Sequence, residues 1–583
     1  MERRKPKNTS STSKKLWRYL KKSKISLFFA IFFVFINCVS NIGGSYLLRP
    51  IINNYIIPGD IQGMLRGMTA LLFIYIAEVS SQYIQSRLMV DVAQRTVNTL
   101  RKDLFSKMQD LPLRFFDTKN HGEIMSRFTN DMDNISESLN FSLTQIFSSI
   151  IIVVGIITIM LIINPLMTLI TVVIIPLMTV LARYILHNSR KYFSAQQAVM
   201  GEINGYAEEI ITGQKVVKVF SFERNVEEEF ERLNTKLQEK ATKAQFYSAL
   251  MIPIMVNINT INYALTACIG GILAIRGSLD IGGLMVFLQY SRMLGRPINE
   301  MTNQINAIQS ALAGAERIFE IMETKPEKED ESDSMELKNI KGDVRFNNVT
   351  FGYNSDKIVL KNISIYAKPG QKIALVGSTG AGKTTITNLL TRFYDIDEGS
   401  ITIDGIDIRK IKKENLRKSL AMVLQDTHLF TGTIIDNIRY GKLEATDEEV
   451  IKAAKLAGAD SFIRRLSNGY NTVIDGDGNN LSQGQRQLLN IARAAVADPP
   501  ILILDEATSS IDTRTEKYIE EGMDRLMEGR TNFIIAHRLS TVRNADAIMV
   551  IENGEIIERG NHEELLKQRG RYYDLCTGAF ELE

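Results

Sequence analysis

The stretch Gly377-Ser378-Thr379-Gly380-Ala381-Gly382-Lys383-Thr384 decides how this chain is organised. An apolar run, residues 373–376, precedes it, and a periodic segment beginning near Thr385 follows it, which predicts a strand, a glycine loop and a helix. Glycines let backbone N–H groups turn around phosphate oxygens, Lys383 reaches the β- and γ-phosphates, and the Thr384 hydroxyl can bind Mg²⁺. A glycine turn that matches by chance is the alternative, but the strand and helix around it argue against that. We therefore predict a nucleoside triphosphate site.

Length and charge limit what the whole chain can be. At 583 residues it is too long for one core, so two or more domains are expected. The net charge of +3 is almost neutral and gives no overall basic excess, so we predict no nucleic-acid partner. The three cysteines, Cys38, Cys268 and Cys576, lie far apart without metal-like spacing and imply no disulfide framework.

The first 24 residues form a basic lead-in, with ten Lys or Arg against one acid, Glu2. Aromatic and aliphatic groups around Trp17 can sit at headgroup level while the lysines meet anionic membrane lipid, so we expect a cytoplasmic amphipathic segment there. A signal peptide is the alternative. The charge-free run that follows, residues 25–48, is however 24 residues long and has the length of a full membrane span.

Further apolar runs predict six membrane spans in all. The run 67–86 is interrupted only by Glu78, and the run 244–275 contains Pro253. Residues 138–182 carry no charge over 45 positions and contain Asn164-Pro165 in the middle, which favours two spans joined by a tight turn.

The sixth span would start near Ile281 and contains three charged residues, Arg292, Arg296 and Glu300. Charges at that depth are tolerated when they face a water-filled cavity or lie at the inner end of the helix, and the sequence leaves both open. Glu78, Arg292 and Glu300 are therefore candidates for lining a substrate cavity.

The segments between the spans alternate in length. Those at 49–66, 164–165 and 276–280 are short, whereas 87–137 and 183–243 are long, charged and helically patterned, so both long segments and both termini are expected in the cytoplasm. Within the long segments, residues 115–122 and 208–215 each break the helical pattern. They are either loops or short turns that contact a neighbouring domain.

The character of the chain changes after the charged, proline-containing run 325–333, which has the composition of a linker. Residues 344–351 alternate as a half-buried strand does, and β and α patterns follow, which predicts a soluble α/β domain. We predict the boundaries that follow: lead-in 1–24, membrane domain 25–322, linker 323–341 and α/β domain 342–583.

Two further patterns in the α/β domain point to phosphate chemistry. The apolar run 501–504 predicts a buried parallel strand with Asp505-Glu506 at its carboxyl end, where ligands bind in such sheets. Asp505 can bind Mg²⁺, and Glu506 is the candidate base that orients the attacking water; a solvated acidic pair is the alternative. Ser482 opens a predicted helix whose N-terminus attracts anions, although an ordinary N-cap would look the same.

Seven motifs together resemble the ATPase of ABC transporters in order and spacing. They are Tyr353, the loop 377–384, Gln425, the segment 481–485, Asp505-Glu506, the segment 509–512 and His537. With six preceding spans, the chain resembles an ABC exporter half-transporter, in which an α-helical membrane domain of six transmembrane helices is fused to one α/β P-loop ABC ATPase domain.

The resemblance implies roles for these residues, with ATP and Mg²⁺ as cofactors. Tyr353 would stack on adenine, Gln425 would sense the γ-phosphate and Mg²⁺ and take part in catalysis with Glu506, and His537 would hold the γ-phosphate and water. Residues assigned to the nucleotide also include Thr385 and, completing the site of a partner subunit, Ser482, Gly484 and Gln485. Asp512 would link the two sites, and segments 115–122 and 208–215 would match the coupling helices.

One departure concerns the partner. The signature motif of the family corresponds to segment 481–485 here. It usually has glycine at the position of Gln483, while Glu506 of this chain is intact. In bacterial heterodimeric multidrug exporters, one subunit similarly keeps the glutamate but has an altered signature. A second ABC half-transporter in a heterodimer is therefore expected, with a homodimer as the alternative.

The resemblance implies ATP-driven export of amphipathic small molecules by alternating access, and we expect the chain in a plasma membrane, specifically a bacterial inner membrane. A lipid or peptide exporter is an alternative. A soluble ABC ATPase is excluded by the six spans, and a nucleotide-gated channel or regulator is disfavoured by the intact Glu506.

Overall fold

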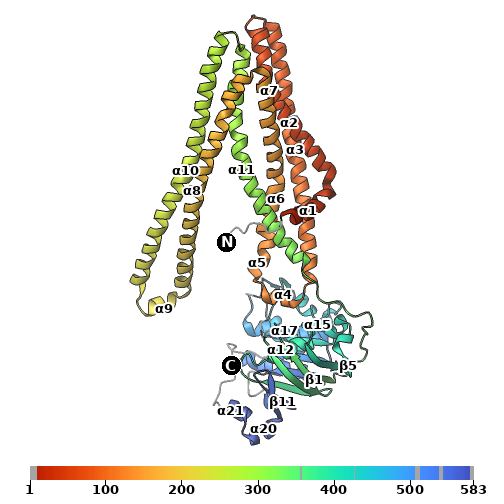
Figure 1. Ribbon diagram of the computed structural model, residues 1–583. Coiled ribbons are helices and arrows are strands. Elements are labelled where there is room, and N and C mark those ends of the chain that lie inside the picture. Colours follow the sequence, from red (N-terminus) through yellow and green to blue (C-terminus); the bar gives the residue numbers. More distant parts are fainter. Residues whose placement is uncertain are drawn as a thin grey trace. The chain divides into compact units, whose positions relative to one another are not determined.

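The computed structural model describes residues 9–354, 357–425, 427–478, 480–505, 513–536 and 542–577. The chain divides into two compact units (Figure 1). Unit 1 comprises Met1–Asp110 and Lys119–Thr324, and unit 2 comprises Leu111–Thr118 and Lys325–Glu583. A short helical segment thus belongs with unit 2 although unit 1 surrounds it in the sequence.

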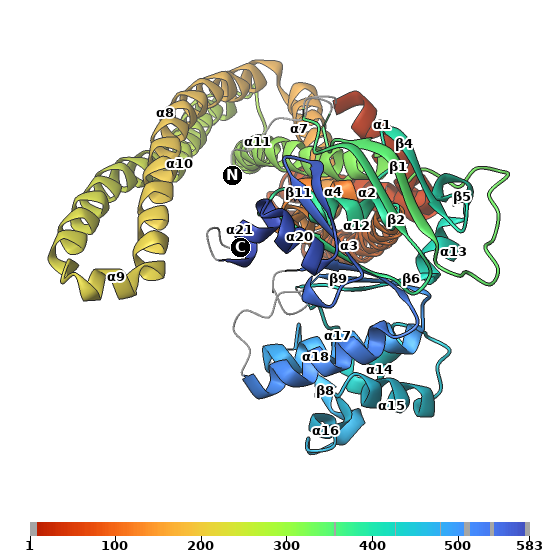
Figure 2. The ribbon, with the colours of Figure 1, turned by 90° about the horizontal axis from the view of Figure 1, so that it is seen from below.

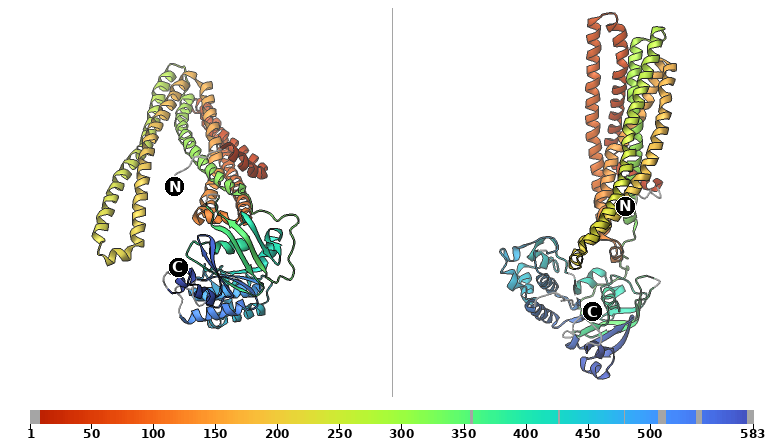
Figure 3. Two further views of the ribbon diagram at one scale, coloured as in Figure 1. Left: turned by 60° about the horizontal axis from the view of Figure 1, so that its bottom comes forward. Right: turned by 90° about the vertical axis from the view of Figure 1, so that its left-hand side faces the viewer.

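Unit 1 is helical, and its longest helices run alongside one another. Figures 1 and 3 show α8 (Pro165–Thr212) and α10 (Glu223–Ile275) side by side, joined at one end by α9 (Gln214–Val219). The other elements of unit 1 are α1 (Thr9–Leu20), η1 (Lys21–Ser23), α2 (Lys24–Ile51), η2 (Ile52–Ile56), α3 (Ile61–Gln109), α5 (His121–Ser126), η3 (Arg127–Asp131), α6 (Met132–Glu137), η4 (Ser138–Ser142), α7 (Leu143–Ile163) and α11 (Ile281–Glu323).

The predicted membrane spans fall on α2, α3, α7, α8, α10 and α11. Within the described residues, four helical stretches are long and apolar enough to cross a membrane: Thr9–Ile56, Ile61–Gln109, His121–Ile163 and Val256–Ile275. Side chains such as Ile25, Phe28 and Phe35 are exposed on α2, as expected where lipid replaces water as the surrounding medium.

Local capping sets the helix ends that the sequence predicted. Asn164 accepts from the Met167 N–H at 3.1 Å and caps α8, whose first residue is Pro165, so the expected tight turn is present. Asp280 caps α11, which begins at Ile281 as predicted.

A buried ionic cluster joins helices within unit 1. Asp131 is 2% exposed and accepts from Arg317 Nε at 2.9 Å and from Arg127 Nη1 at 3.5 Å. Gly314 of α11 packs directly on Asp131, because a Cβ there would lie 3.3 Å from the Asp131 Cα. The helices therefore meet at a charged contact that leaves little room for change.

Unit 2 contains a six-stranded sheet and a four-stranded antiparallel sheet (Figure 2). The strand order is β12-β11-β3-β10-β9-β6 in the larger sheet, where all neighbours except β11 and β12 are parallel, and β2-β1-β4-β5 in the smaller. The strands are β1 (Val344–Phe351), β2 (Leu360–Ala367), β3 (Lys372–Val376), β4 (Glu398–Ile403), β5 (Ile406–Asp407), β6 (Leu420–Val423), β7 (Gly432–Thr433), β8 (Val473–Ile474), β9 (Ile501–Asp505), β10 (Thr531–Ile535), β11 (Ala547–Glu552) and β12 (Glu555–Gly560).

Helices complete unit 2 on either side of the larger sheet. They are α4 (Leu113–Thr118), α12 (Lys383–Leu390), η5 (Ile408–Lys410), α13 (Lys413–Lys418), α14 (Ile434–Arg439), α15 (Asp447–Leu456), α16 (Asp460–Ile463), η6 (Gly469–Asn471), α17 (Gln483–Ala497), α18 (Thr513–Met527), α20 (His562–Gln568) and α21 (Arg571–Cys576).

Alternate side chains of the larger sheet enter two separate cores. Leu502 and Leu504 of β9 pack in the cluster that contains α14 to α18, whereas Ile501 and Ile503 pack in the cluster formed with α12 and the smaller sheet. Because both faces are covered, residues 501–504 of β9 are all apolar, as predicted. The predicted strand 344–351 coincides with β1.

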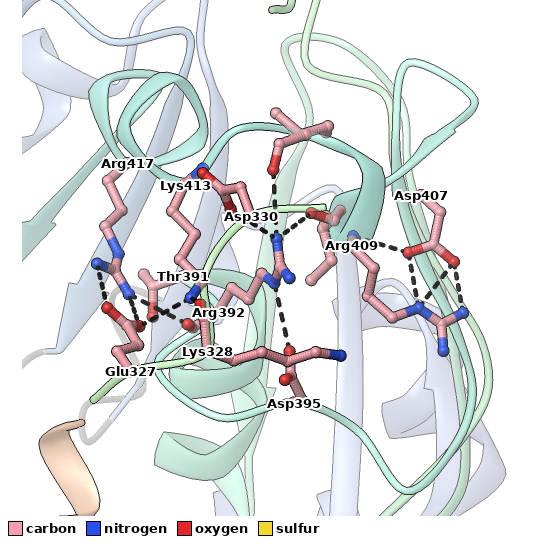
Figure 4. Close-up of polar contacts among 12 residues, drawn as sticks. Glu327, Lys328, Asp330, Thr391, Arg392, Asp395, Asp407, Arg409, Lys413 and Arg417 are labelled. Atoms are coloured by element: carbon pink, nitrogen blue, oxygen red, sulfur yellow. Dashed lines mark hydrogen bonds and ion pairs between the residues drawn. The ribbon is translucent and has the colours of Figure 1, made fainter. Parts of the chain in front are cut away.

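The charged run expected to be a linker is bound to unit 2 over much of its length (Figure 4). Arg417 Nη2 lies 2.5 Å from a Glu327 oxygen, and the Lys413 N–H donates to Asp330 at 3.0 Å. Arg392, 2% exposed, places its guanidinium 3.5 Å from Asp330 and donates to two main-chain carbonyls. These contacts hold the run against α13.

Candidate functional site

The parallel strands bring three of the predicted site elements to one edge of the sheet. Leu375 of β3 is in register with Ile535 of β10, and Ile535 is in register with Asp505 of β9. Leu504 is in register with Val423, the last residue of β6. The glycine loop, Asp505 and Gln425 thus follow the carboxyl ends of neighbouring strands, where α/β sheets bind ligands. Glu506 and His537 come next after described residues of β9 and β10, but they, like Asp512, lie outside the described residues.

The glycine loop has a backbone that side chains would disturb. Gly377, Gly380 and Gly382 all have positive φ, of 156°, 82° and 107°. A Cβ at Gly377 would lie 2.1 Å from the Ile551 carbonyl oxygen, so glycine is needed for the close approach of β11. Ser378, Thr379 and Gly380 are exposed, whereas Ala381 is buried. Residues 378–380 of the loop are therefore accessible to a ligand.

Lys383 is held inside this loop. Its Nζ donates to the carbonyl oxygens of Gly377 at 2.7 Å and Ser378 at 3.0 Å. Burial lowers the pKa of the Lys383 ammonium, and the nearby Asp505 carboxylate partly opposes that shift. The Lys383 ammonium is thus fixed inside the loop by two of the loop's own carbonyl groups.

The donors present fit a magnesium nucleotide. The Thr384 hydroxyl belongs to an exposed residue in the first turn of α12, and Asp505 supplies a carboxylate at the same sheet edge. Among the described residues, no group of three or more His, Cys, Asp or Glu could hold a metal. A hard ion bound by one hydroxyl and one carboxylate, with phosphate oxygens and water completing its ligands, matches that donor set.

Tyr353 is held beside the loop by polar and aromatic contacts. Its hydroxyl lies 3.2 Å from Thr385 Oγ1 and accepts from Asn388 Nδ2 at 3.4 Å. Its ring meets the Tyr394 ring edge-on at 4.9 Å between centroids. Thr385 is buried, and its hydroxyl contact helps to position Tyr353.

Tyr394, which the sequence analysis missed, connects Tyr353 to α4. Its hydroxyl donates to Asp117 of α4, and Arg114 Nη2 donates to Asn354 Oδ1 at 3.3 Å. Burial and the Asp117 carboxylate raise the pKa of Tyr394. Segment 115–122 contains a helix end and the N-cap Asn120, so the predicted break in the pattern is present. The sequence signal that could have identified Tyr394 is its position as an aromatic residue shortly after α12, the helix that follows the glycine loop.

The segment around Gln425 is tied to α17 by two buried polar residues that were also missed. Gln425 is itself exposed. Thr427 Oγ1 donates to Gln487 Oε1 at 2.7 Å, and Asn490 Nδ2 donates to the Leu424 carbonyl at 3.4 Å. Polar residues spaced three apart on an otherwise apolar helix face were the signal that could have found them.

Arg493, three residues further along α17, continues this polar stripe. It donates to the carbonyls of Asn437 and His428, both at 3.0 Å, and its guanidinium lies 5.8 and 5.6 Å from the centroids of the Phe430 and Tyr440 rings, which pack on each other. Burial lowers the pKa of Arg493. Gln487, Asn490 and Arg493 together fix the chain on both sides of Gln425.

The signature residues open α17 and do not join the sheet edge. Ser482 accepts from the Gln485 N–H at 3.3 Å, while the Gln485 side chain accepts from the Ser482 N–H at 3.0 Å, forming a capping box. Gly484 is buried, whereas Ser482 and Gln483 are exposed. Their outward placement at a helix N-terminus suits a ligand that another molecule brings.

The three charged candidates in the helices of unit 1 all have partners there. Glu78 accepts from Asn41 Nδ2 at 2.8 Å, and Glu300 accepts from Gln145. The Arg292 guanidinium lies 4.0 Å from the centroid of the Tyr263 ring. Pairing of this kind lowers the cost of a charge among apolar helices.

Comparison with known proteins adds two family matches. Residues 27–298 match the family described as ABC transporter transmembrane region, and residues 360–509 match the family described as ABC transporter.

Several curated relatives resemble almost the whole chain. The uncharacterized ABC transporter ATP-binding protein YfiC of Bacillus subtilis is 45% identical over all of this chain and 96% of its own length. A fatty acid ABC transporter ATP-binding/permease protein of Mycobacterium bovis is 42% identical over 89% of this chain and 83% of its own. The ATP-dependent lipid A-core flippase of Syntrophus aciditrophicus is 37% identical over 92% and 89%.

A solved structure shares the fold. A bacterial Atm1-family ABC exporter with ATP bound aligns with a TM-score of 0.74 and 29% identity, over 95% of this chain and 98% of that one.

Proposed function

Because this chain belongs to the ABC transporter family and is an exporter-type half-transporter whose ATP hydrolysis is coupled to transport, we propose that it exports amphipathic small molecules as one half of a heterodimer. The observation that carries this proposal is the sheet edge, where the glycine loop, Lys383 and Asp505 meet beside Gln425.

The residues at the sheet edge divide the chemistry between them. The loop amides and Lys383 would bind the β- and γ-phosphates, and Thr384, Asp505 and Gln425 would hold Mg²⁺, which supplies charge neutralisation for phosphoryl transfer. Glu506 would orient the attacking water, His537 would hold the γ-phosphate, and Tyr353 would stack on adenine. Positioning and electrostatics supply most of the rate in this reaction, so these roles need only a fixed geometry.

Coupling to the membrane helices would use two short segments. Asp117 of the α4 segment accepts a hydrogen bond from Tyr394, and the Tyr394 ring packs against Tyr353. The α9 segment leaves large apolar side chains exposed, among them Val219 and Phe220, at 77% and 73%. An exposed apolar patch of this kind marks a protein contact, and we assign it to the ATPase domain of the partner.

Gln483 favours a heterodimer. It is exposed next to Ser482 at the N-terminus of α17, where the usual signature has glycine. In the proposed dimer, Ser482, Gly484 and Gln485 would complete the partner's nucleotide site, which Gln483 would weaken. Asp512 would link the two sites. The homodimer remains the competing arrangement.

The substrate is proposed as an amphipathic molecule. Charged residues such as Glu78 and Arg292 among apolar helices suit a molecule with a polar head and an apolar body. Two relatives are named for a fatty acid and for lipid A-core, so lipid export is the second candidate.

The bacterial relatives support a place in the bacterial inner membrane, with both termini and the ATPase domain in the cytoplasm. The proposed organisation keeps a lead-in at 1–24, a membrane domain at 25–322, a linker at 323–341 and the ATPase domain at 342–583.

Transport into inside-out proteoliposomes tests the substrate class. ATP-dependent uptake of a fluorescent amphipathic dye, absent in Glu506→Gln, would support multidrug export, whereas uptake of a fluorescent fatty acid alone would favour the lipid candidate. Glu78→Gln and Arg292→Gln should shift the preference between charged dyes. Active ATP hydrolysis without uptake of either probe would contradict both candidates.

A further inference from the structure

A pocket of about 260 Å³ lies between the N-terminal helices and α3 of unit 1, and none of its lining residues belongs to the nucleotide site. Tyr19, Lys22 and Ser23 line it from the α1 side, and Arg95, Thr96 and Asn98 line it from α3. Each of these side chains carries a polar atom, so the pocket does not suit an apolar ligand.

The N-terminal segment on one side of the pocket is basic. Residues 9–24 carry six Lys or Arg and no acid. The two nearby carboxylates are engaged, because Asp91 pairs with Arg95 at 2.8 Å and Asp103 accepts from the Tyr19 hydroxyl at 3.0 Å. Lys22, in contrast, makes no ion pair within the described part of the chain, and its Nζ lies 5.5 Å from the centroid of the Tyr19 ring. Lys22 and Arg95 are thus matched in number by Asp91 and Asp103, and the positive excess near the pocket comes from the other Lys and Arg of residues 9–24.

A buried hydroxyl group at the pocket wall lacks a partner. Thr96 is 3% exposed, and its Oγ1 makes no hydrogen bond to any described residue. Buried polar groups without partners are uncommon because they are costly. The donors of Lys22, Arg95 and Asn98 on the pocket lining suit a ligand with several oxygen acceptors.

The pocket lies where the apolar surface of unit 1 begins. Ser23 lines it, and Ile25 and Phe28, each 66% exposed, follow on α2. Trp17 on α1 is 56% exposed among lysines. Tryptophan and lysine at the start of an apolar span are typical of the headgroup level of a membrane.

We propose that this pocket binds the phosphate headgroup of an anionic phospholipid, with the acyl chains along Ile25 and Phe28. Lys22 supplies a charge that is not paired within the described residues, and Arg95 and Asn98 supply hydrogen-bond donors. The lipid stays bound and fixes α1 at the membrane face, so this role is separate from the transported substrate.

The single tryptophan of the chain, Trp17, provides the readout. The full chain is reconstituted in bilayers that contain brominated phosphatidylglycerol or brominated phosphatidylcholine, and quenching of Trp17 is compared. We expect stronger quenching by phosphatidylglycerol than by phosphatidylcholine. This preference should fall about fivefold in Lys22→Gln and in Asn98→Asp, because removing one positive charge or adding one negative charge at the membrane surface weakens lipid binding by about that factor. Lys22→Arg should restore it.

Matched variants outside the pocket separate a site from diffuse attraction. Lys14→Gln and Gln94→Glu make the same charge changes at exposed positions of α1 and α3 that do not line the pocket, and they should leave the preference unchanged. An equal fall in these controls, or no preference in the wild type, would overturn the proposal. Loss of the preference on adding glycerol 3-phosphate would overturn the lipid source in favour of a soluble phosphate ester.

ATP hydrolysis measured on the same samples keeps the two proposals apart. Normal hydrolysis in Lys22→Gln with lost lipid preference supports the pocket and shows that the fold is intact. A wild-type chain that prefers phosphatidylglycerol but does not transport would contradict the proposed function and leave the pocket standing.

Discussion

The side-chain nitrogen of Lys383 lies 2.7 Å from the carbonyl oxygen of Gly377, at the opposite end of the same loop. This hydrogen bond closes the loop on itself and fixes the cation 7% exposed behind the exposed residues 378–380. The stability and the nucleotide affinity of the loop should both depend on that ammonium.

The pH dependence of stability tests the environment of Lys383. Burial lowers its folded-state pKa below the ordinary value of about 10.4, so between those two values the unfolded chain binds the proton more strongly. The free energy of unfolding should therefore rise with pH in that interval, and less so in Lys383→Met. Thermal unfolding of the full chain in detergent at stepped alkaline pH measures this. Equal slopes for the two proteins would contradict the buried placement.

Two glycine substitutions separate close packing from backbone strain. Gly377→Ala would place a Cβ 2.1 Å from the Ile551 carbonyl, whereas Gly380→Ala has open space and only a φ of 82° to accommodate. We expect Gly377→Ala to abolish ATP binding and Gly380→Ala to cost about 1 kcal/mol of loop stability. Titration with a fluorescent ATP analogue compares them. Similar affinities in the two variants would argue against the close approach of β11.

A double-mutant cycle tests the link between α17 and the Gln425 segment. Thr427 and Gln487 share a hydrogen bond of 2.7 Å. Thr427→Val and Gln487→Leu should each slow ATP hydrolysis, and the double variant should be less impaired than the sum by about 1 kcal/mol. The turnover rates of the four proteins at saturating ATP give the coupling. Simple additivity would mean that the contact plays no part in positioning Gln425.

The buried cluster around Asp131 should matter far more than an exposed pair of the same chemistry. Asp131→Asn leaves Arg317 and Arg127 without their carboxylate, which we expect to cost about 3 kcal/mol. Asp91→Asn removes the exposed pair with Arg95 and should cost less than about 1 kcal/mol. Unfolding temperatures in detergent measure both. If Asp91→Asn cost as much as or more than Asp131→Asn, the Asp131 cluster would not be the more stabilising of the two ionic contacts, contrary to this prediction.

Local patterns in the sequence predicted the elements that depend on local physics. The alternation of residues 344–351 matches β1, the buried run 501–504 falls in β9, and Asn164-Pro165 forms the expected turn. Each depends on periodicity or on capping, which neighbouring residues determine.

Contacts between distant parts of the sequence could not be predicted in this way. The composition of the run 325–333 predicts a linker but not that Glu327 pairs with Arg417 and Asp330 with Arg392, 90 and 62 positions away. Tyr394 and Gln487 acquire their roles only when α4 and the Gln425 segment pack against them. Composition reports the charge of a residue but not its partner.

The ATPase activity of the purified chain in lipid, alone and with a co-expressed candidate partner, tests the central claim most directly. Wild type and Glu506→Gln are compared in both settings. The account predicts hydrolysis only with the partner, lost in Glu506→Gln while ATP binding is kept. Full activity of the chain alone would contradict the heterodimer, and undiminished activity of Glu506→Gln would contradict the assignment of the catalytic carboxylate.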